Sequence, residues 1–264
     1  MTQPRWFIAP LAAALVFLAV ACGGDKKDND SANADTPGGG GAATSQALDL
    51  SSAAESLLDV KSFRFNLSLK LNVDDPTGGS GSDDNAFGAA MLALLGNINV
   101  NGAYVSPDRY EVQTKLFGQD VHAIQIGDQA WVNDGSGWTE TESADDLGMF
   151  GLSGSPTDLL NEFLPEEVLS GAKTKQEKVN GVDTTRYSFD KKSLSDLAEK
   201  LGEDTGQFDE VDDLNLDVWV TKDNLPVKIA LKGSGESEGT KMSVEVNFNI
   251  TDLNDSGIKI EKPI

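Results

Sequence analysis

The feature that most constrains the fold is a strict two-residue alternation along residues 62–73. Every odd position there is apolar, from Phe63 to Val73, and every even position is polar, from Ser62 to Asn72. A period of two over so long a run predicts a β-strand with one buried and one solvated face. Because parallel strands are buried on both faces and read as continuous apolar runs, this alternation indicates an antiparallel sheet.

Further strands are expected along the rest of the chain. Residues 214–220 and 225–231 alternate in the same way and are joined by Thr221-Lys222-Asp223-Asn224, which predicts a hairpin. A second hairpin is expected within residues 127–138, where an Asn-Asp-Gly-Ser-Gly turn separates two strand segments. The other strand segments are 97–105, 109–117, 119–127, 129–133, 183–190 and 242–250. Together they make one wide sheet with a large apolar face.

Three helices are expected to cover that face. Residues 48–60 and 191–201 carry apolar side chains at helical spacing, and residues 155–164 begin with Ser155 as a cap and Pro156 at the first helical position. The sequence therefore predicts an α+β fold, a strongly curved antiparallel half-barrel sheet with helices on its concave face. We expect an apolar concave surface that the helices leave partly unfilled.

The inward positions of the expected strands are candidates for ligand contact, because the alternation points their apolar side chains into the concave face. These positions are Phe63, Phe65, Leu67, Leu69, Val218, Val220, Val227, Ile229, Leu231, Val244, Val246 and Phe248.

Residues 86–95 (AFGAAMLALL) form a segment that is apolar nearly all round and follows the polar, Gly-rich residues 75–85. Such a segment must be buried in the protein or touch lipid. Two interpretations are open, a core helix and a mobile lid over an apolar cavity. In the second, the ligand contacts are Phe87, Met91, Leu92 and Leu95.

Residues 1–21 are typical of a secretory signal peptide, with Arg5 ahead of an apolar run and small residues before Cys22. Cys22 is the only cysteine in the chain and lies where cleavage would make it the new N-terminus. This arrangement resembles the bacterial lipoprotein signal, in which that thiol receives a diacylglyceryl group. A plain signal peptide or an N-terminal membrane helix is the alternative. Residues 22–45 then predict an acylated Cys22 with a disordered tether, followed by a single domain at 46–264.

Composition and motifs exclude several function classes. The chain has 43 acidic and 21 basic residues and a net charge of −22, which argues against binding nucleic acid. No Walker loop, dinucleotide fingerprint or HExxH motif occurs. The single histidine, His122, has no cysteine to act with, and no His/Cys cluster offers a metal site. We therefore expect no catalytic residues, no cofactor and no metal.

Several motifs follow one another in a recognisable order. They are residues 60–63 (VKSF) leading into the long strand, the 127–138 hairpin, residues 181–187 (GVDTTRY), and residues 217–220 (DVWV) through 225–228 (LPVK). With the acyl anchor and tether, this order resembles the LppX/LprG type of actinobacterial lipoprotein and, more distantly, the LolA/LolB lipoprotein-localisation fold. The resemblance implies a half-barrel closed by helices around a hydrophobic cavity that carries acylated lipids across the envelope, with no catalytic residues.

We therefore expect a lipid-anchored protein on the extracytoplasmic face of the cell membrane. It would bind an acylated lipid or glycolipid in a hydrophobic cavity and carry it within the envelope, with an envelope transporter or acceptor protein as a further partner. One alternative is an envelope signalling or stress-sensing lipoprotein of the same fold, for which the lipid or a peptide is an input. Another is a structural lipoprotein with a filled core.

Overall fold

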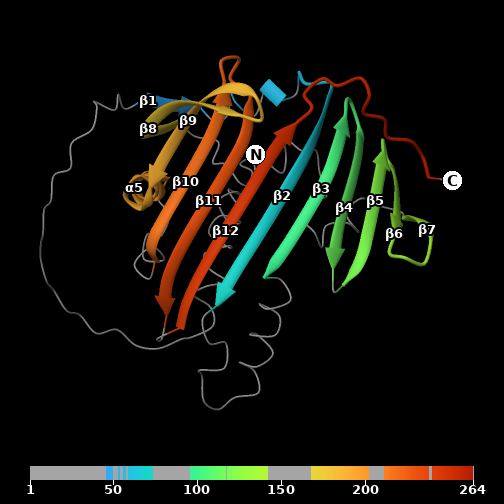
Figure 1. The fold of residues 1–264 in the computed structure, drawn as a ribbon, viewed down its shortest axis with the longest axis horizontal. Helices are drawn as coiled ribbons and strands as arrows, with labels where there is room; N and C mark the ends of the chain where they lie inside the picture. Colours follow the sequence, from blue (N-terminus) through green and yellow to red (C-terminus); the bar gives the residue numbers. More distant parts are fainter. Residues whose placement is uncertain are drawn as a thin grey trace, which may run out of the picture.

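The strands of the computed structural model form one continuous sheet (Figure 1). The structure describes residues 46–49, 53, 56, 57, 59–73, 96–116, 118–141, 168–201, 211–237 and 240–263. Within them, twelve strands lie in the order β1-β8-β9-β10-β11-β12-β2-β3-β4-β5-β6-β7, and each neighbouring pair is antiparallel. The alternating pattern therefore gave the correct strand direction.

The elements have the following bounds. The strands are β1 (Gln46–Asp49), β2 (Ser62–Val73), β3 (Asn97–Val105), β4 (Arg109–Leu116), β5 (Gln119–Ile126), β6 (Gln129–Asn133), β7 (Trp138–Thr141), β8 (Val168–Val179), β9 (Val182–Asp190), β10 (Val211–Thr221), β11 (Pro226–Ser237) and β12 (Thr240–Thr251). Helix α5 spans Lys191–Leu201.

The centre of the sheet is the pairing of β12 with β2, the two strands with the strictest alternation. Phe248 lies opposite Leu67 and Ile250 lies opposite Phe65, so the apolar side chains of both strands share one face. On either side of this pair the strands follow one another in chain order, β2 to β7 on one side and β12 back to β8 on the other.

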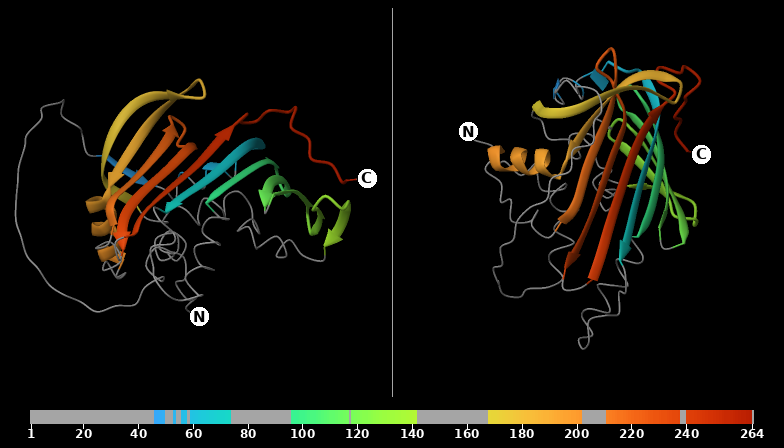
Figure 2. Two further views of the ribbon diagram at one scale, coloured as in Figure 1. Left: turned by 60° about the horizontal axis from the view of Figure 1, so that its bottom comes forward. Right: turned by 60° about the vertical axis from the view of Figure 1, so that its left-hand side comes forward.

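The two faces of the sheet differ in character. We call the side that carries Phe63 the inner face and the side that carries Asn66 the outer face. The main core lies on the inner face and draws its side chains from β2, β3 and β8 to β12. Figure 2 shows the sheet twisting and arching, with α5 beside one end of it. Leu194 of α5 joins this core where the helix contacts β8, β9 and β10.

The expected α+β class, with helices on the concave face, is wrong. Residues 191–201 form α5 as expected, and the described residues Ala53, Ser56 and Leu57 are helical within the expected helix at 48–60. The expected helix at 48–60 is replaced at its start by β1, whose Leu48 pairs with Leu169 of β8. Pairing with the edge of the sheet satisfies the backbone groups there and overrides the helical spacing. Residues 155–164 and 86–95 lie outside the described residues.

The chain after β12 packs against the outer face. Ile258 and Ile260 form a small buried cluster with Ala103, Ile124 and Trp131. The Arg109 guanidinium donates a hydrogen bond to the Ile260 carbonyl at 3.0 Å. This C-terminal segment therefore covers the part of the outer face that would otherwise expose apolar side chains of β3, β5 and β6. No helix in the described ranges has the length and apolarity needed to cross a membrane.

Candidate functional site

The predicted ligand contacts on the strands lie mostly on the inner face. Eleven of the twelve belong to the main core, nine of them buried and two, Leu67 and Leu69, partly buried. Cys22 and the predicted contacts Phe87, Met91, Leu92 and Leu95 lie outside the described residues.

One end of the inner face is closed by aromatic packing. The rings of Phe63 and Tyr104 lie 5.2 Å apart between centroids, and those of Phe65 and Phe248 lie 5.9 Å apart. Phe63 is 1% exposed and Phe65 is 5% exposed. These residues therefore fill a core at this end.

Burial decreases toward the other end of β2. Leu67, Leu69 and Leu71 point to the same face as Phe63 but are only half-buried. Ile98, which lies opposite Leu69 on β3, is half-buried as well. The inner face therefore ends in aliphatic side chains that remain partly accessible, and we call these four residues the aliphatic end.

Val227 departs from the predicted arrangement. It packs with Trp219 and Ala230 in a separate small cluster. The pairing of β10 with β11 shifts register between Trp219 and Val220, so the alternation along β11 does not carry through to Val227.

Trp219 makes polar contacts on the outer face. The centre of its ring lies 4.6 Å from the Lys228 Nζ, and its Nε1 donates a hydrogen bond to the Glu177 carboxylate. This bond, more than the nearby Lys175, lowers the pKa of the Glu177 carboxyl.

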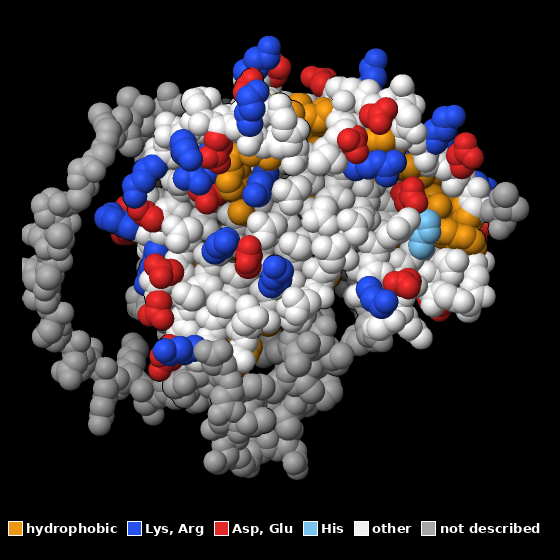
Figure 3. Space-filling model, in the orientation of Figure 1, with side chains coloured by type: hydrophobic (Ala, Val, Ile, Leu, Met, Phe, Trp, Pro, Cys, Tyr) orange, Lys and Arg blue, Asp and Glu red, His pale blue; other side chains and the backbone are white. Residues whose placement is uncertain are grey.

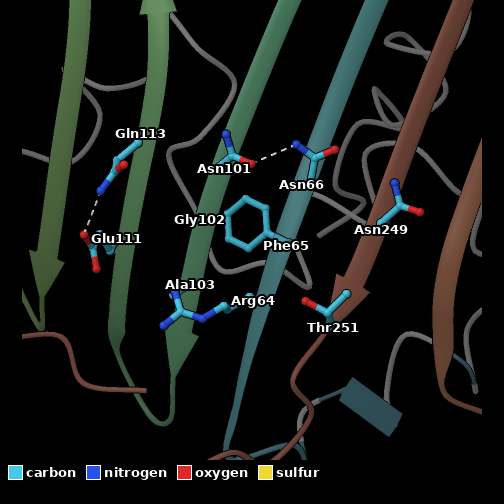
Figure 4. Close-up of a pocket in the computed structure, with 10 residues that line it drawn as sticks. All are labelled: Arg64, Phe65, Asn66, Asn101, Gly102, Ala103, Glu111, Gln113, Asn249 and Thr251. Atoms are coloured by element: carbon cyan, nitrogen blue, oxygen red, sulfur yellow. Dashed lines mark hydrogen bonds between the residues drawn. The ribbon is translucent and has the colours of Figure 1, made fainter. Parts of the chain in front are cut away.

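A polar groove of about 300 Å³ lies on the outer face, over β12, β2, β3 and β4 (Figure 4). Four of the side chains that line it are amides, and we therefore call it the amide groove. Its lining residues are Arg64, Phe65, Asn66, Asn101, Gly102, Ala103, Glu111, Gln113, Asn249 and Thr251.

The groove owes its shape to small residues on β3. Ala103 adds only a methyl group to the outer face, and Gly102 adds no side chain on the inner face. A Cβ on Gly102 would lie 2.2 Å from Cζ of Phe65, so the Phe65 ring occupies the space of the missing side chain. Longer side chains on β2 and β4 therefore stand on either side of a depression in β3.

Hydrogen bonds hold the amides of the groove in place. Asn66 Nδ2 donates to Asn101 Oδ1 at 2.9 Å and to Asn99 Oδ1 at 3.1 Å, and Asn101 Nδ2 donates to Asn99 Oδ1 at 2.9 Å. On the opposite wall, Gln113 Nε2 donates to Glu111 Oε1 at 3.1 Å. The side chains are therefore oriented before any ligand binds.

The single histidine lies beside this groove. His122 Nε2 is 2.8 Å from Glu111 Oε1, and its ring meets Trp138 edge-on, with the ring centroids 4.7 Å apart. Among the described residues no three His, Cys, Asp or Glu side chains gather as a metal site. The arrangement offers hydrogen bonds and ring surfaces for binding.

The sequence interpretation did not single out the amide groove. Its signal is the recurrence of asparagine at alternate strand positions, because asparagine is depleted in β-strands. The even positions of residues 62–73 were interpreted only as a solvated face. The register that brings Asn249, Asn66 and Asn101 side by side comes from pairing between distant parts of the chain.

Comparisons with known proteins give little further guidance. No protein-family model matches the sequence, and no curated protein matches it. Among solved structures, the fold is similar to that of a DUF1329 family protein from Desulfovibrio piger, at 12% sequence identity, with 80% of this chain and 92% of that chain covered and a TM-score of 0.25. This likeness does not assign the chain to the LppX/LprG type or the LolA/LolB fold.

Proposed function

We propose that this protein is a lipid-anchored, extracytoplasmic carrier that binds an acylated lipid or glycolipid against the inner face of its sheet. The observation that supports the proposal is the aliphatic end. Leu67, Leu69 and Leu71 face the core side of the sheet but stay half-buried. In this proposal Cys22 carries the anchor, as in the LppX/LprG-type lipoproteins that the sequence resembles.

The energetics favour an apolar ligand at this place. Burial of apolar surface stabilises by about 25 cal/mol per Å², or about 0.8 kcal/mol for each CH₂ group. An acyl chain that binds along the aliphatic end removes its own apolar surface and that of the covered leucine side chains from water, and both contribute to the free energy of binding. The aromatic packing of Phe63 and Phe65 at the opposite end leaves no comparable opening there.

Native mass spectrometry of the full chain, purified from membranes in detergent, tests the proposal. We expect non-covalent adducts with the mass of phospholipid or glycolipid, in addition to the covalent anchor. Leu69→Trp should lower the adduct fraction because the larger ring occupies the aliphatic end. Ser68→Trp is the matched control, since Ser68 is the neighbouring position on the outer face of β2.

Two results would contradict the proposal. One is a chain that carries no non-covalent lipid and takes up none from vesicles of phosphatidylglycerol. The other is an equal loss of lipid from both tryptophan variants, which would place the lipid away from the inner face.

A further inference from the structure

The amide groove lies on the opposite face of the sheet from the proposed lipid site and needs an explanation of its own. Three adjacent strands carry seven asparagines on their outer faces. They are Asn66 and Asn72 of β2, Asn97, Asn99 and Asn101 of β3, and Asn247 and Asn249 of β12.

This composition is unfavourable for the sheet itself. Asparagine is depleted in strands, whereas threonine and other β-branched residues fit a pleated surface well. Solubility does not require amides, because charged residues satisfy a solvated face equally well. A local preference that is broken repeatedly on one surface points to a binding function for that surface.

The outer face around the amide groove carries few charged side chains, although the chain has a net charge of −22, and Lys232 and Glu245 beside it form an ion pair. Figure 3 shows that uncharged side chains, drawn white with the backbone, dominate this region. The amide groove itself holds one cation, Arg64, and one carboxylate, Glu111. Its formal charge is therefore balanced, which suits an uncharged ligand better than an anion or a cation.

The amides present both donors and acceptors to a ligand. Both described bonds of Asn66 to other side chains use Nδ2, which leaves its Oδ1 as a free acceptor. Asn249 has no side-chain hydrogen-bond partner in the described part of the chain, so its amide offers two donors and an acceptor. A hydroxyl group is likewise both donor and acceptor, so it complements a primary amide.

The polar side chains form a straight row across the strands. Asn249 lies opposite Asn66, Asn66 opposite Asn101, Asn101 opposite Gln113, and Gln113 opposite His122. Four strand spacings of about 4.8 Å give this row a length of roughly 19 Å. Such a row suits an extended ligand with several regularly spaced hydroxyl groups.

An aromatic ring stands at the end of the row. Trp138 meets His122 edge-on and keeps part of its side chain accessible beside the buried cluster of Trp131. An indole offers an apolar face next to a polar edge, which suits a ligand with both kinds of surface.

We propose that the amide groove binds a neutral oligosaccharide, laid across the strands from Asn249 toward His122 and Trp138. The ligand's hydroxyl groups exchange hydrogen bonds with the amides, and the C–H face of a sugar ring at the far end packs on the indole. A groove of about 300 Å³ is at the lower end of the range for small-molecule sites, about 300–1,000 Å³. Beyond the groove, His122 and Trp138 continue the row of polar side chains and lengthen the proposed binding site along the outer face.

Isothermal titration calorimetry with defined tetrasaccharides tests this proposal. The full chain, in a detergent without a sugar head group, is titrated with maltotetraose, cellotetraose, mannotetraose and chitotetraose. We expect saturable binding of at least one of them. Asn249→Ala should weaken that binding about tenfold, as expected for the loss of hydrogen bonds made only to the ligand.

The controls separate this site from a general effect on the sheet. Asn72→Ala removes an amide of the same outer face that does not line the groove, and binding should stay unchanged. Asn249 has no side-chain partner among the described residues, so Asn249→Ala should leave the unfolding midpoint in urea unchanged.

Several outcomes would overturn the proposal. They are the absence of saturable binding of all four sugars at millimolar concentration, and equal weakening by Asn249→Ala and Asn72→Ala. A loss of sugar binding on Leu69→Trp with none on Asn249→Ala would place the sugar on the inner face. Failure of the lipid proposal leaves these results unaffected, because lipid adducts and sugar binding are measured separately.

Discussion

At the scale of single residues, Gly102 shows how tightly the central strands pack. A Cβ at this position would lie 2.2 Å from Phe65 Cζ and 2.7 Å from the Glu111 carbonyl oxygen, so the ring and the backbone must both shift. We expect Gly102→Ala to lower the free energy of unfolding by about 1–3 kcal/mol, as overpacking does. Urea unfolding followed by circular dichroism measures this change.

Gly233→Ala is the matched control for this prediction. The nearest atoms to a Cβ on Gly233 would be the side-chain atoms Leu214 Cδ1 and Val244 Cγ1, both at 3.3 Å, and the Asp213 carbonyl oxygen would lie at an ordinary contact distance of 3.8 Å. The two side-chain atoms can yield by a few tenths of an ångström, so we expect a clearly smaller loss. Equal losses for the two alanine variants would show that the Phe65 ring and the backbone at Glu111 both yield freely.

Single residues also mark where sequence interpretation stops. The alternation correctly predicted which of the long β2 side chains face the core, because the strand period is fixed by backbone geometry. It did not predict the separate place of Val227, because a register shift depends on the partner strand. The amide groove could not be predicted for the same reason, because Asn66 and Asn249 become neighbours only when their strands pair.

At the scale of elements, α5 begins with a side-chain cap that predicts a pH dependence. Asp190 Oδ1 accepts hydrogen bonds from the backbone N–H of Ser193 at 3.0 Å and from the Ser193 hydroxyl at 2.9 Å. These bonds, the backbone one first, lower the pKa of Asp190. We expect Asp190→Ala to cost about 1 kcal/mol of unfolding free energy at neutral pH.

The sign of the pH effect follows from the lowered pKa. The cap contributes fully above the usual aspartate pKa of about 3.9, and its contribution is lost as the pH falls through the lower folded-state pKa. The difference between the wild type and Asp190→Ala should therefore shrink in acid, as measured by urea unfolding across this range. Asp190→Asn keeps an acceptor and should retain most of the stability. A difference that is constant with pH would contradict the role of the charged cap.

The C-terminal segment makes a second prediction at this scale. Ile260 is 2% exposed in its cluster with Trp131 and Ile258, although it lies in an extended segment outside the sheet. Ile260→Ala should lower the free energy of unfolding by about 2–5 kcal/mol, because it leaves a cavity. Lys259→Ala, at the exposed neighbouring position, should change the free energy by less than about 0.5 kcal/mol. Similar small changes in both variants would show that the segment is not part of the core.

Elements with a strong periodic signal were predicted well. The observed bounds of β2, β3, β6 and α5 match the predicted ranges, and the turn at Thr221–Asn224 closes with a hydrogen bond from the Thr221 N–H to the Leu225 carbonyl. Strand β8 was not predicted, because its sequence VLSGAKTKQEKV lacks apolar alternation. Strand β1 was mistaken for the start of a helix, because four residues are too few to show a period.

At the scale of the whole molecule, one sheet presents two unlike surfaces. Side chains alternate between the faces along every strand, so an aliphatic surface and an amide surface can share the same strands. Phe65 and Asn66 are neighbours in the chain but face opposite ways. In our proposals a lipid contacts one face and a sugar the other, and neither ligand has to displace the other.

The proposed anchor at Cys22 would determine where such a two-sided domain works, and it makes the last prediction. Cys22 is the only cysteine, so a thioether to a diacylglyceryl group can form only at this residue. Cells grown with an alkyne analogue of palmitate should label the wild-type protein, and Cys22→Ala should abolish the label. Asp25→Ala, three residues further along, is the control and should keep it.

The physical reason lies in the number of acyl chains. Each buried CH₂ group contributes about 0.8 kcal/mol, so a single chain binds a membrane reversibly and two or more hold it stably. The labelled wild-type protein should therefore stay with membranes through a carbonate wash. Labelling that persists in Cys22→Ala would rule out Cys22 as the lipid attachment site, and with it the membrane-anchored placement of the carrier.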